Sequence, residues 1–110
     1  MKDTYRVRFS PAAMEDLQNI YLYIASELMA PVAAENQVNR IRSGIRSLVT
    51  FPSRHVLVDW EPWASAGVHK LPIDNYVVYY QVAEEEQTVM IVRIFYGGRN
   101  VKAIVEELDS

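Results

Sequence analysis

The sequence predicts one α+β domain over residues 1–110, with an N-terminal strand, a helical hairpin, a three-stranded antiparallel meander and a short C-terminal helix. Three observations predict it. A short alternating segment opens the chain, apolar residues recur at helical spacing over residues 13–48, and runs rich in β-branched and aromatic residues lie at 76–82 and 88–96. The helices should cover one face of the sheet and leave the other open to water.

The opening strand, residues 5–9, alternates apolar and basic side chains, which is typical of a half-buried strand. Its inward residues should be Tyr5, Val7 and Phe9. Arg6 and Arg8 should therefore point to the open face of the sheet.

Two amphipathic helices follow, and the first begins at Ser10-Pro11, an N-cap residue and a proline suited to the first helical position. It should end before Pro31, and the second helix should stop at Phe51-Pro52. The residues predicted to face the core are Ala13, Leu17, Ile20, Ile24 and Leu28 in the first helix, and Ala34, Val38, Ile41, Ile45 and Leu48 in the second.

The meander should consist of strands at 69–73, 76–82 and 88–96, joined by the turn at Asp74-Asn75 and by a polar loop. Strict alternation assigns the side chains to two faces. The inward set is Leu71, Ile73, Tyr76, Val78, Tyr80, Val82, Met90, Val92, Ile94 and Tyr96. The outward set, mixed aromatic and basic, is Lys70, Val77, Tyr79, Gln81, Ile91, Arg93 and Phe95.

Residues 53–66 show no clean period and should be irregular, with Trp60 and Trp63 either covering part of the core or anchoring a protein partner. The terminal helix keeps helical spacing at Val101, Ile104, Val105 and Leu108. With about two turns it should be loosely held.

Composition excludes several classes of function. There is no cysteine for a disulfide or thiolate site, and His55 and His69 lack a third ligand at suitable spacing, so we expect no metal and no cofactor. No apolar run approaches the roughly 18 residues that span a bilayer, so a cytoplasmic protein without membrane contact is expected. The net charge of −3 argues against general nucleic-acid binding.

Four segments, in their order along the chain, resemble the RelE/ParE superfamily of toxins from bacterial type II toxin-antitoxin modules of the plasmid-stabilisation type. They are Phe9–Leu17, Lys70–Pro72, Tyr76–Tyr80 and Arg93–Arg99, and the likeness extends from Tyr5 to about Leu108. The resemblance implies a flexible antitoxin that silences the toxin, and contact with operator DNA only through that antitoxin. It leaves open a homodimer or a heterotetramer with the antitoxin.

Members of this superfamily divide in mechanism. RelE-like toxins cut messenger RNA on the ribosome with several Lys, Arg and Tyr side chains, whereas ParE-like toxins poison DNA gyrase. Lys70 and Arg99 match RelE positions. Val68, Val77 and Val105 stand where the RelE type has a lysine, an arginine and a tyrosine, and valine cannot donate a hydrogen bond to a phosphate. The pattern therefore favours the ParE type.

Three functions remain open from the sequence: gyrase inhibition by binding, ribosome-dependent cleavage of messenger RNA, and a non-toxic partner of the antitoxin in promoter regulation. Whether the protein is an enzyme is thus undecided. Candidate catalytic residues for a nuclease are Lys70, Arg93, Arg99, Tyr79 and Tyr96. Candidate partner-binding residues are Arg6, Arg8, Lys70, Arg93 and Arg99, which could equally be plain solvated charges.

Overall fold

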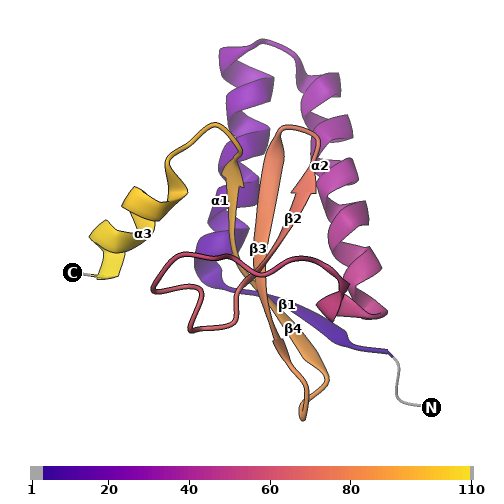
Figure 1. The fold of residues 1–110 in the computed structure, drawn as a ribbon. Helices are drawn as coiled ribbons and strands as arrows, with labels where there is room; N and C mark the ends of the chain where they lie inside the picture. The colour runs from indigo at the N-terminus through magenta and orange to yellow at the C-terminus, as the bar shows by residue number, and fades with distance from the viewer. Residues whose placement is uncertain (1–3, 110) are drawn as a thin grey trace.

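A mixed four-stranded sheet forms the centre of the computed structural model, which describes residues 4–109 (Figure 1). The strand order is β1-β4-β3-β2; β1 and β4 run parallel and the other neighbours run antiparallel. The strands are β1 (Arg6–Phe9), β2 (His69–Ile73), β3 (Tyr76–Ala83) and β4 (Thr88–Tyr96). The helices are α1 (Pro11–Leu22), α2 (Pro31–Arg46) and α3 (Val101–Asp109). This is the predicted α+β fold, with the N-terminal strand at one edge of the meander.

The helical hairpin begins as the sequence predicts. The Ser10 hydroxyl accepts a hydrogen bond from the Ala13 N–H at 3.0 Å and donates one to the Val92 carbonyl at 2.8 Å, so the cap also ties α1 to β4. After Leu22 the helix widens into a π-helical turn, Tyr23–Glu27. Leu28, which was expected in the core, is 56% exposed, because this turn and the left-handed Met29 carry the chain away from the sheet.

Helix α2 packs closely on the sheet edge through Gly44. A Cβ built on Gly44 would overlap the side chain of Ile73 in β2, so the absence of a side chain lets the helix approach the strand. The predicted stripe is confirmed, since Ala34, Val38, Ile41, Ile45 and Leu48 are all buried.

A main core lies between the hairpin and the sheet. It contains the predicted residues of β3, with Val78 and Tyr80 fully buried and Tyr76 and Val82 packed around them. In β4 the strict alternation is wrong for the first half, because Tyr79 pairs with Arg93 whereas Tyr80 pairs with Ile91. Val92 is thus the extra residue of a β-bulge, which turns Ile91 inward where Met90 and Val92 were expected.

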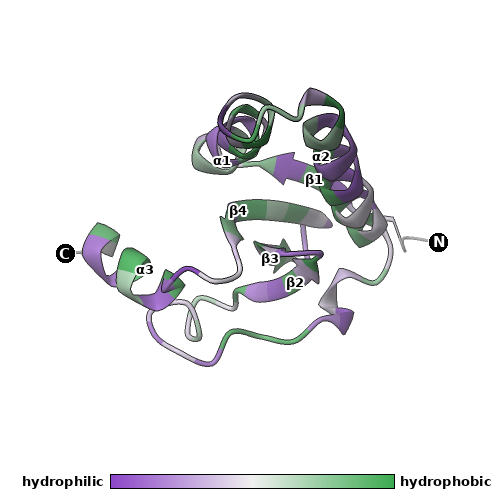
Figure 2. Cartoon of the chain, turned by 90° about the horizontal axis from the view of Figure 1, so that it is seen from above, coloured by the Kyte–Doolittle hydropathy of each residue, from purple (hydrophilic) through white to green (hydrophobic). Residues whose placement is uncertain are grey.

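The second face of the sheet is covered, which corrects the expectation of a face open to water. Figure 2 shows the irregular segment 53–66 and α3 on the side of the sheet opposite α1 and α2. A second apolar cluster forms there, with Trp60, Trp63, Val77 and Ile104 packed against a buried group of six: Val58, Val68, Tyr79, Phe95, Val101 and Val105. The tryptophans therefore cover a core, one of the two roles predicted for them.

The cover is irregular, as expected for residues 53–66, with a 3-10 turn at Pro52–Arg54 and a single bridge between Leu57 and His69. Helix α3 is anchored through Val101 and Val105, whereas Leu108, predicted on the same stripe, is 66% exposed. Among the described residues, no helix has the length and apolar character to span a bilayer.

Candidate partner-binding site

Arg6 and Arg8 lie on β1, which the structure places at the edge of the sheet. Both are exposed, while Tyr5, Val7 and Phe9 pack against the main core. Arg8 pairs with Met90 in the parallel ladder, so these arginines stand beside the N-terminal half of β4. Within residues 4–109 neither arginine forms an ion pair, so both present cations at a sheet edge.

Lys70, Tyr79 and Arg93 stand in one row across β2, β3 and β4, because Tyr79 is the register partner of both other residues. Tyr79 is only 6% exposed. Its ring contacts Trp63 at 4.9 Å and Phe95 at 6.2 Å between centroids, and burial raises the pKa of its hydroxyl. As a candidate for chemistry Tyr79 is therefore poorly placed, since it belongs to the second apolar cluster.

Arg93 does not display the free charge that the sequence suggested. Its Nε and Nη2 atoms donate to the two carboxylate oxygens of Asp16 at 2.7 and 2.9 Å. The same carboxylate accepts the Ile94 N–H at 2.9 Å, and the side chains of Arg93 and Asp16 are 22% and 11% exposed. The hydrogen bonds that Arg93 donates to Asp16 raise the pKa of Arg93. Its cation is thus neutralised within the chain.

The role of Asp16 follows from where β1 ends. Among residues 4–109 no strand pairs with that edge of β4 beyond Phe9, and Asp16 reaches from α1 to satisfy the Ile94 N–H there. Sequence reasoning missed this role, because an acid early in a helix is already explained by the helix dipole.

Arg93 and Arg99 meet at the ring of Phe95. Their guanidinium carbons lie 4.5 and 5.3 Å from its centroid, within the range of cation–π attraction. Arg99 is exposed, and the turn before it is tight: Gly97 donates its N–H to the Asn75 carbonyl at 2.7 Å. Arg99 is therefore exposed to a partner while its guanidinium rests near the ring of Phe95.

Tyr96 and Arg99 share a groove of about 810 Å³ between the end of the helical hairpin and the sheet. Tyr96 is 52% exposed and meets Tyr76 edge-on at 5.8 Å. Other groove-lining residues include Asp16, Tyr23, Leu28 and Arg40. The structure thus groups Arg93, Arg99 and Tyr96, and leaves Arg6 and Arg8 at the β1 edge.

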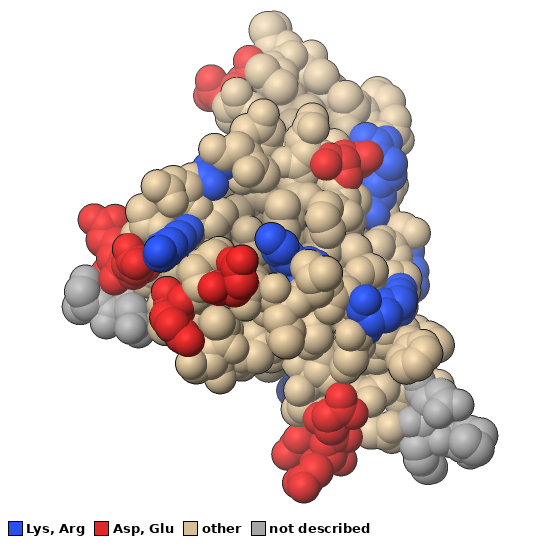
Figure 3. Space-filling view, in the orientation of Figure 1, with Lys and Arg blue, Asp and Glu red and all other residues tan. Residues whose placement is uncertain are grey.

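Charges on the face covered by residues 53–66 and α3 are dispersed (Figure 3). The acids gather at the tip of the β3–β4 hairpin and around α3, while the basic side chains form separate spots. No extended basic surface of the kind that tracks a nucleic-acid backbone is visible on this face.

Val68, Val77 and Val105, the valines that the sequence resemblance matched to RelE functional positions, meet in the second apolar cluster. Val68 is 1% and Val105 5% exposed. The positions that would present a lysine and a tyrosine to RNA are therefore inside a core.

The contacts of His55 and His69 are structural. His69 stacks on Tyr80 at 5.1 Å, and its Nδ1 atom lies 2.8 Å from the His55 carbonyl oxygen. Burial lowers the pKa of His55, which favours its neutral form. Within residues 4–109 no three side chains of the metal-ligating types come together.

A family model described as the ParE toxin of the type II toxin-antitoxin system parDE matches residues 7–101. The chain belongs to this ParE family. A search of curated proteins finds no match. A solved structure described as the chromosomal ParDE system from P. aeruginosa superposes with a TM-score of 0.69 at 21% identity, covering 86% of this chain and 97% of that one.

Two RelBE complexes also share the fold of this ParE-family toxin. The RelBE2 toxin-antitoxin complex from Mycobacterium tuberculosis matches with a TM-score of 0.62 at 21% identity, covering 87% of this chain and 94% of that one. The archaeal RelE–RelB complex from Pyrococcus horikoshii matches with a TM-score of 0.60 at 17% identity, with coverages of 87% and 98%. The RelE/ParE resemblance seen in the sequence is confirmed.

Proposed function

We propose that this ParE-family toxin arrests growth by binding DNA gyrase, without chemistry of its own, and that a cognate antitoxin neutralises it. The observation that carries the proposal is the valine trio Val68, Val77 and Val105 inside the second apolar cluster. A RelE-like nuclease would need donors at these positions.

Negative charge develops on the phosphate while the RNA chain is cleaved. Removing one donor that stabilises such a charge costs about 10²-fold or more in rate. Here three donors are missing, Tyr79 is buried, and the cation of Arg93 is paired with Asp16. Such losses in rate need not be additive, but few side chains remain that could stabilise the charge on the phosphate.

The alternative is ribosome-dependent cleavage of messenger RNA by a rearranged set. One observation favours it: Arg99 and Tyr96 are exposed and share a groove, and Lys70 lies in the same row as Arg93. A non-toxic protein that only binds the antitoxin and regulates its promoter is the third candidate.

Two assays on the purified toxin separate the three. We expect inhibition of gyrase supercoiling of a relaxed plasmid and no cleavage of messenger RNA on translating ribosomes. Cleavage that Arg99→Ala abolishes, with gyrase unaffected, would replace the proposal by the nuclease. Inactivity in both assays, from protein that still binds its antitoxin, would identify the regulator.

A further inference from the structure

The groove between the end of the helical hairpin and the sheet brings together three tyrosine side chains from three separate elements. Tyr23 comes from the π-helical turn, Tyr76 from β3 and Tyr96 from β4. Burial raises the pKa of Tyr76, and the nearby hydroxyls of Tyr23 and Tyr96 raise it further. Unlike the buried hydroxyl of Tyr80, these three hydroxyls have no hydrogen-bond partner within residues 4–109. The groove therefore holds three donors that a partner can satisfy.

The same groove has one uncompensated charge. Three charged side chains line it: Asp16, Arg40 and Arg99. Asp16 is paired with Arg93 at 2.7 Å, and Arg40 is paired with Asp74 at 2.6 Å. In the described part of the chain Arg99 forms no ion pair. With one unpaired cation beside the tyrosine hydroxyls, the groove favours a carboxylate over a cation or a neutral group.

Much of the remaining lining is apolar. Ile24, Ile94 and Phe95 are buried, whereas Leu28 is exposed because the π-helical turn moves it away from the core. Tyrosine and arginine around an apolar surface are typical of the residues that dominate the energy of protein–protein contacts. A nucleic-acid backbone would instead require several cations to neutralise its phosphates. The groove thus suits a protein segment in which a large aliphatic side chain lies next to a carboxylate.

This groove and the arginine edge of β1 lie at opposite ends of β4. Strand β1 pairs with residues 88–91 of β4, whereas residues 94–96 line the groove. Figure 1 shows the end of the hairpin and the β2–β3 turn together at the top, away from the β3–β4 hairpin at the bottom. Two different partners therefore have separate surfaces at the two ends.

We propose that this groove is the surface through which the toxin binds gyrase, with an aliphatic side chain of gyrase against Leu28 and Tyr96 and an adjoining carboxylate at Arg99. The tyrosine hydroxyls donate hydrogen bonds to the same acidic segment. The inference rests on the proposed function and assigns to it a site on this chain. The antitoxin is the competing occupant.

The test measures gyrase supercoiling of a relaxed plasmid with increasing amounts of purified toxin. Leu28→Glu and Arg99→Glu should each raise the toxin concentration for half-inhibition by about tenfold or more, because both place an anion where a carboxylate of gyrase is bound. The double variant Tyr23→Phe/Tyr96→Phe keeps both rings and loses two donors, so it should raise that concentration by roughly threefold or more. Because the rings remain, this variant keeps the test valid if a charged variant unfolds.

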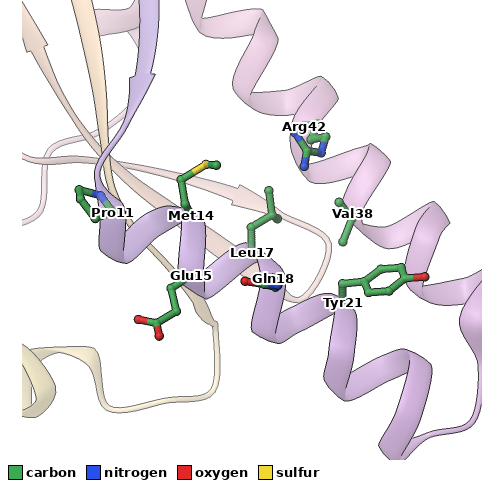
Figure 4. A pocket seen from close by; sticks show the side chains of 8 residues that line it. All are labelled: Pro11, Met14, Glu15, Leu17, Gln18, Tyr21, Val38 and Arg42. Carbon is green, nitrogen blue, oxygen red and sulfur yellow. The ribbon is translucent and has the colours of Figure 1, made fainter.

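The groove between α1 and α2, of about 620 Å³, supplies matched controls (Figure 4). Its lining includes a single tyrosine, Tyr21, and charges of both signs, Glu15 and Arg42. Met14 in this groove is 56% exposed, as is Leu28. Met14→Glu therefore introduces the same charge at the same exposure, and Arg42→Glu reverses a cation. Both should stay within about twofold of wild type in gyrase inhibition.

Antitoxin affinity and melting temperature are measured for every variant. Wild-type inhibition that Leu28→Glu, Arg99→Glu and the double variant all retain would overturn the site and leave the proposed function intact. Retained inhibition with weakened antitoxin binding would assign the groove to the antitoxin instead. An equal loss in Met14→Glu would also contradict the site, because the effect would not be specific to this groove. A wild-type toxin without effect on gyrase would refute the proposed function and the site together.

Discussion

Asp16→Ala should destabilise this toxin more than any change at an exposed ion pair. The substitution removes both hydrogen bonds to Arg93 and the one to the Ile94 N–H, leaving a half-buried cation and a backbone donor without their acceptor. Breaking a buried ion pair costs about 3–5 kcal/mol and an exposed pair about 0–1 kcal/mol. With side chains 22% and 11% exposed, the Arg93–Asp16 pair lies nearer the buried limit, so we expect about 3 kcal/mol.

Urea unfolding followed by the fluorescence of Trp60 and Trp63 measures this loss. In thermal unfolding, each kcal/mol of lost stability lowers the melting temperature of a chain of this length by about 4 °C, so Asp16→Ala should lower it by roughly 12 °C. The double variant Asp16→Ala/Arg93→Met should recover much of the loss, because no cation is then left unpaired.

The matched control is Asp74→Asn, which breaks the Arg40–Asp74 pair, whose side chains are 56% and 40% exposed. Its effect should be several-fold smaller, since water already screens these charges. Equal losses of stability in Asp16→Ala and Asp74→Asn would refute the reasoning. A double variant no more stable than Asp16→Ala would also refute it.

Two further predictions concern the antitoxin. Charge reversal of both Arg6 and Arg8, which are exposed and alternate with core residues on β1, should weaken the complex by more than about tenfold if the partner is acidic; titration calorimetry at two salt concentrations measures it. Amide exchange across residues 101–108 should be fast in the free toxin and slow in the complex, because α3 is a nine-residue helix anchored through two buried valines and the partly buried Ile104.

Each of these has a contradicting outcome. An unchanged Kd after reversal of both arginines would remove the β1 edge from the antitoxin interface. Protection of α3 in the free toxin equal to that of β3 and β4 would show that the second apolar cluster holds the helix as firmly as the sheet.

Much of the fold could be predicted because local sequence encodes it. The Ser10 cap follows from residue type. The helical stripes, except Leu28, and the inward residues of β1 and β3 follow from spacings of 3.6 and 2 residues. The family resemblance likewise rested on the order of short segments, and the ParE match confirms it.

Only the tertiary structure decided what depends on residues far apart in the chain. The bulge at Val92 reverses which side chains are buried in the first half of β4, and a one-residue shift leaves no clear trace in an apolar run. Arg93 looked free because its partner Asp16 is 77 residues away. The open face was closed by Trp60, Trp63 and α3, whose segments have too little periodicity to show where they pack. Local sequence thus determined the elements, while long-range packing determined which of their charges and rings remain available to a partner.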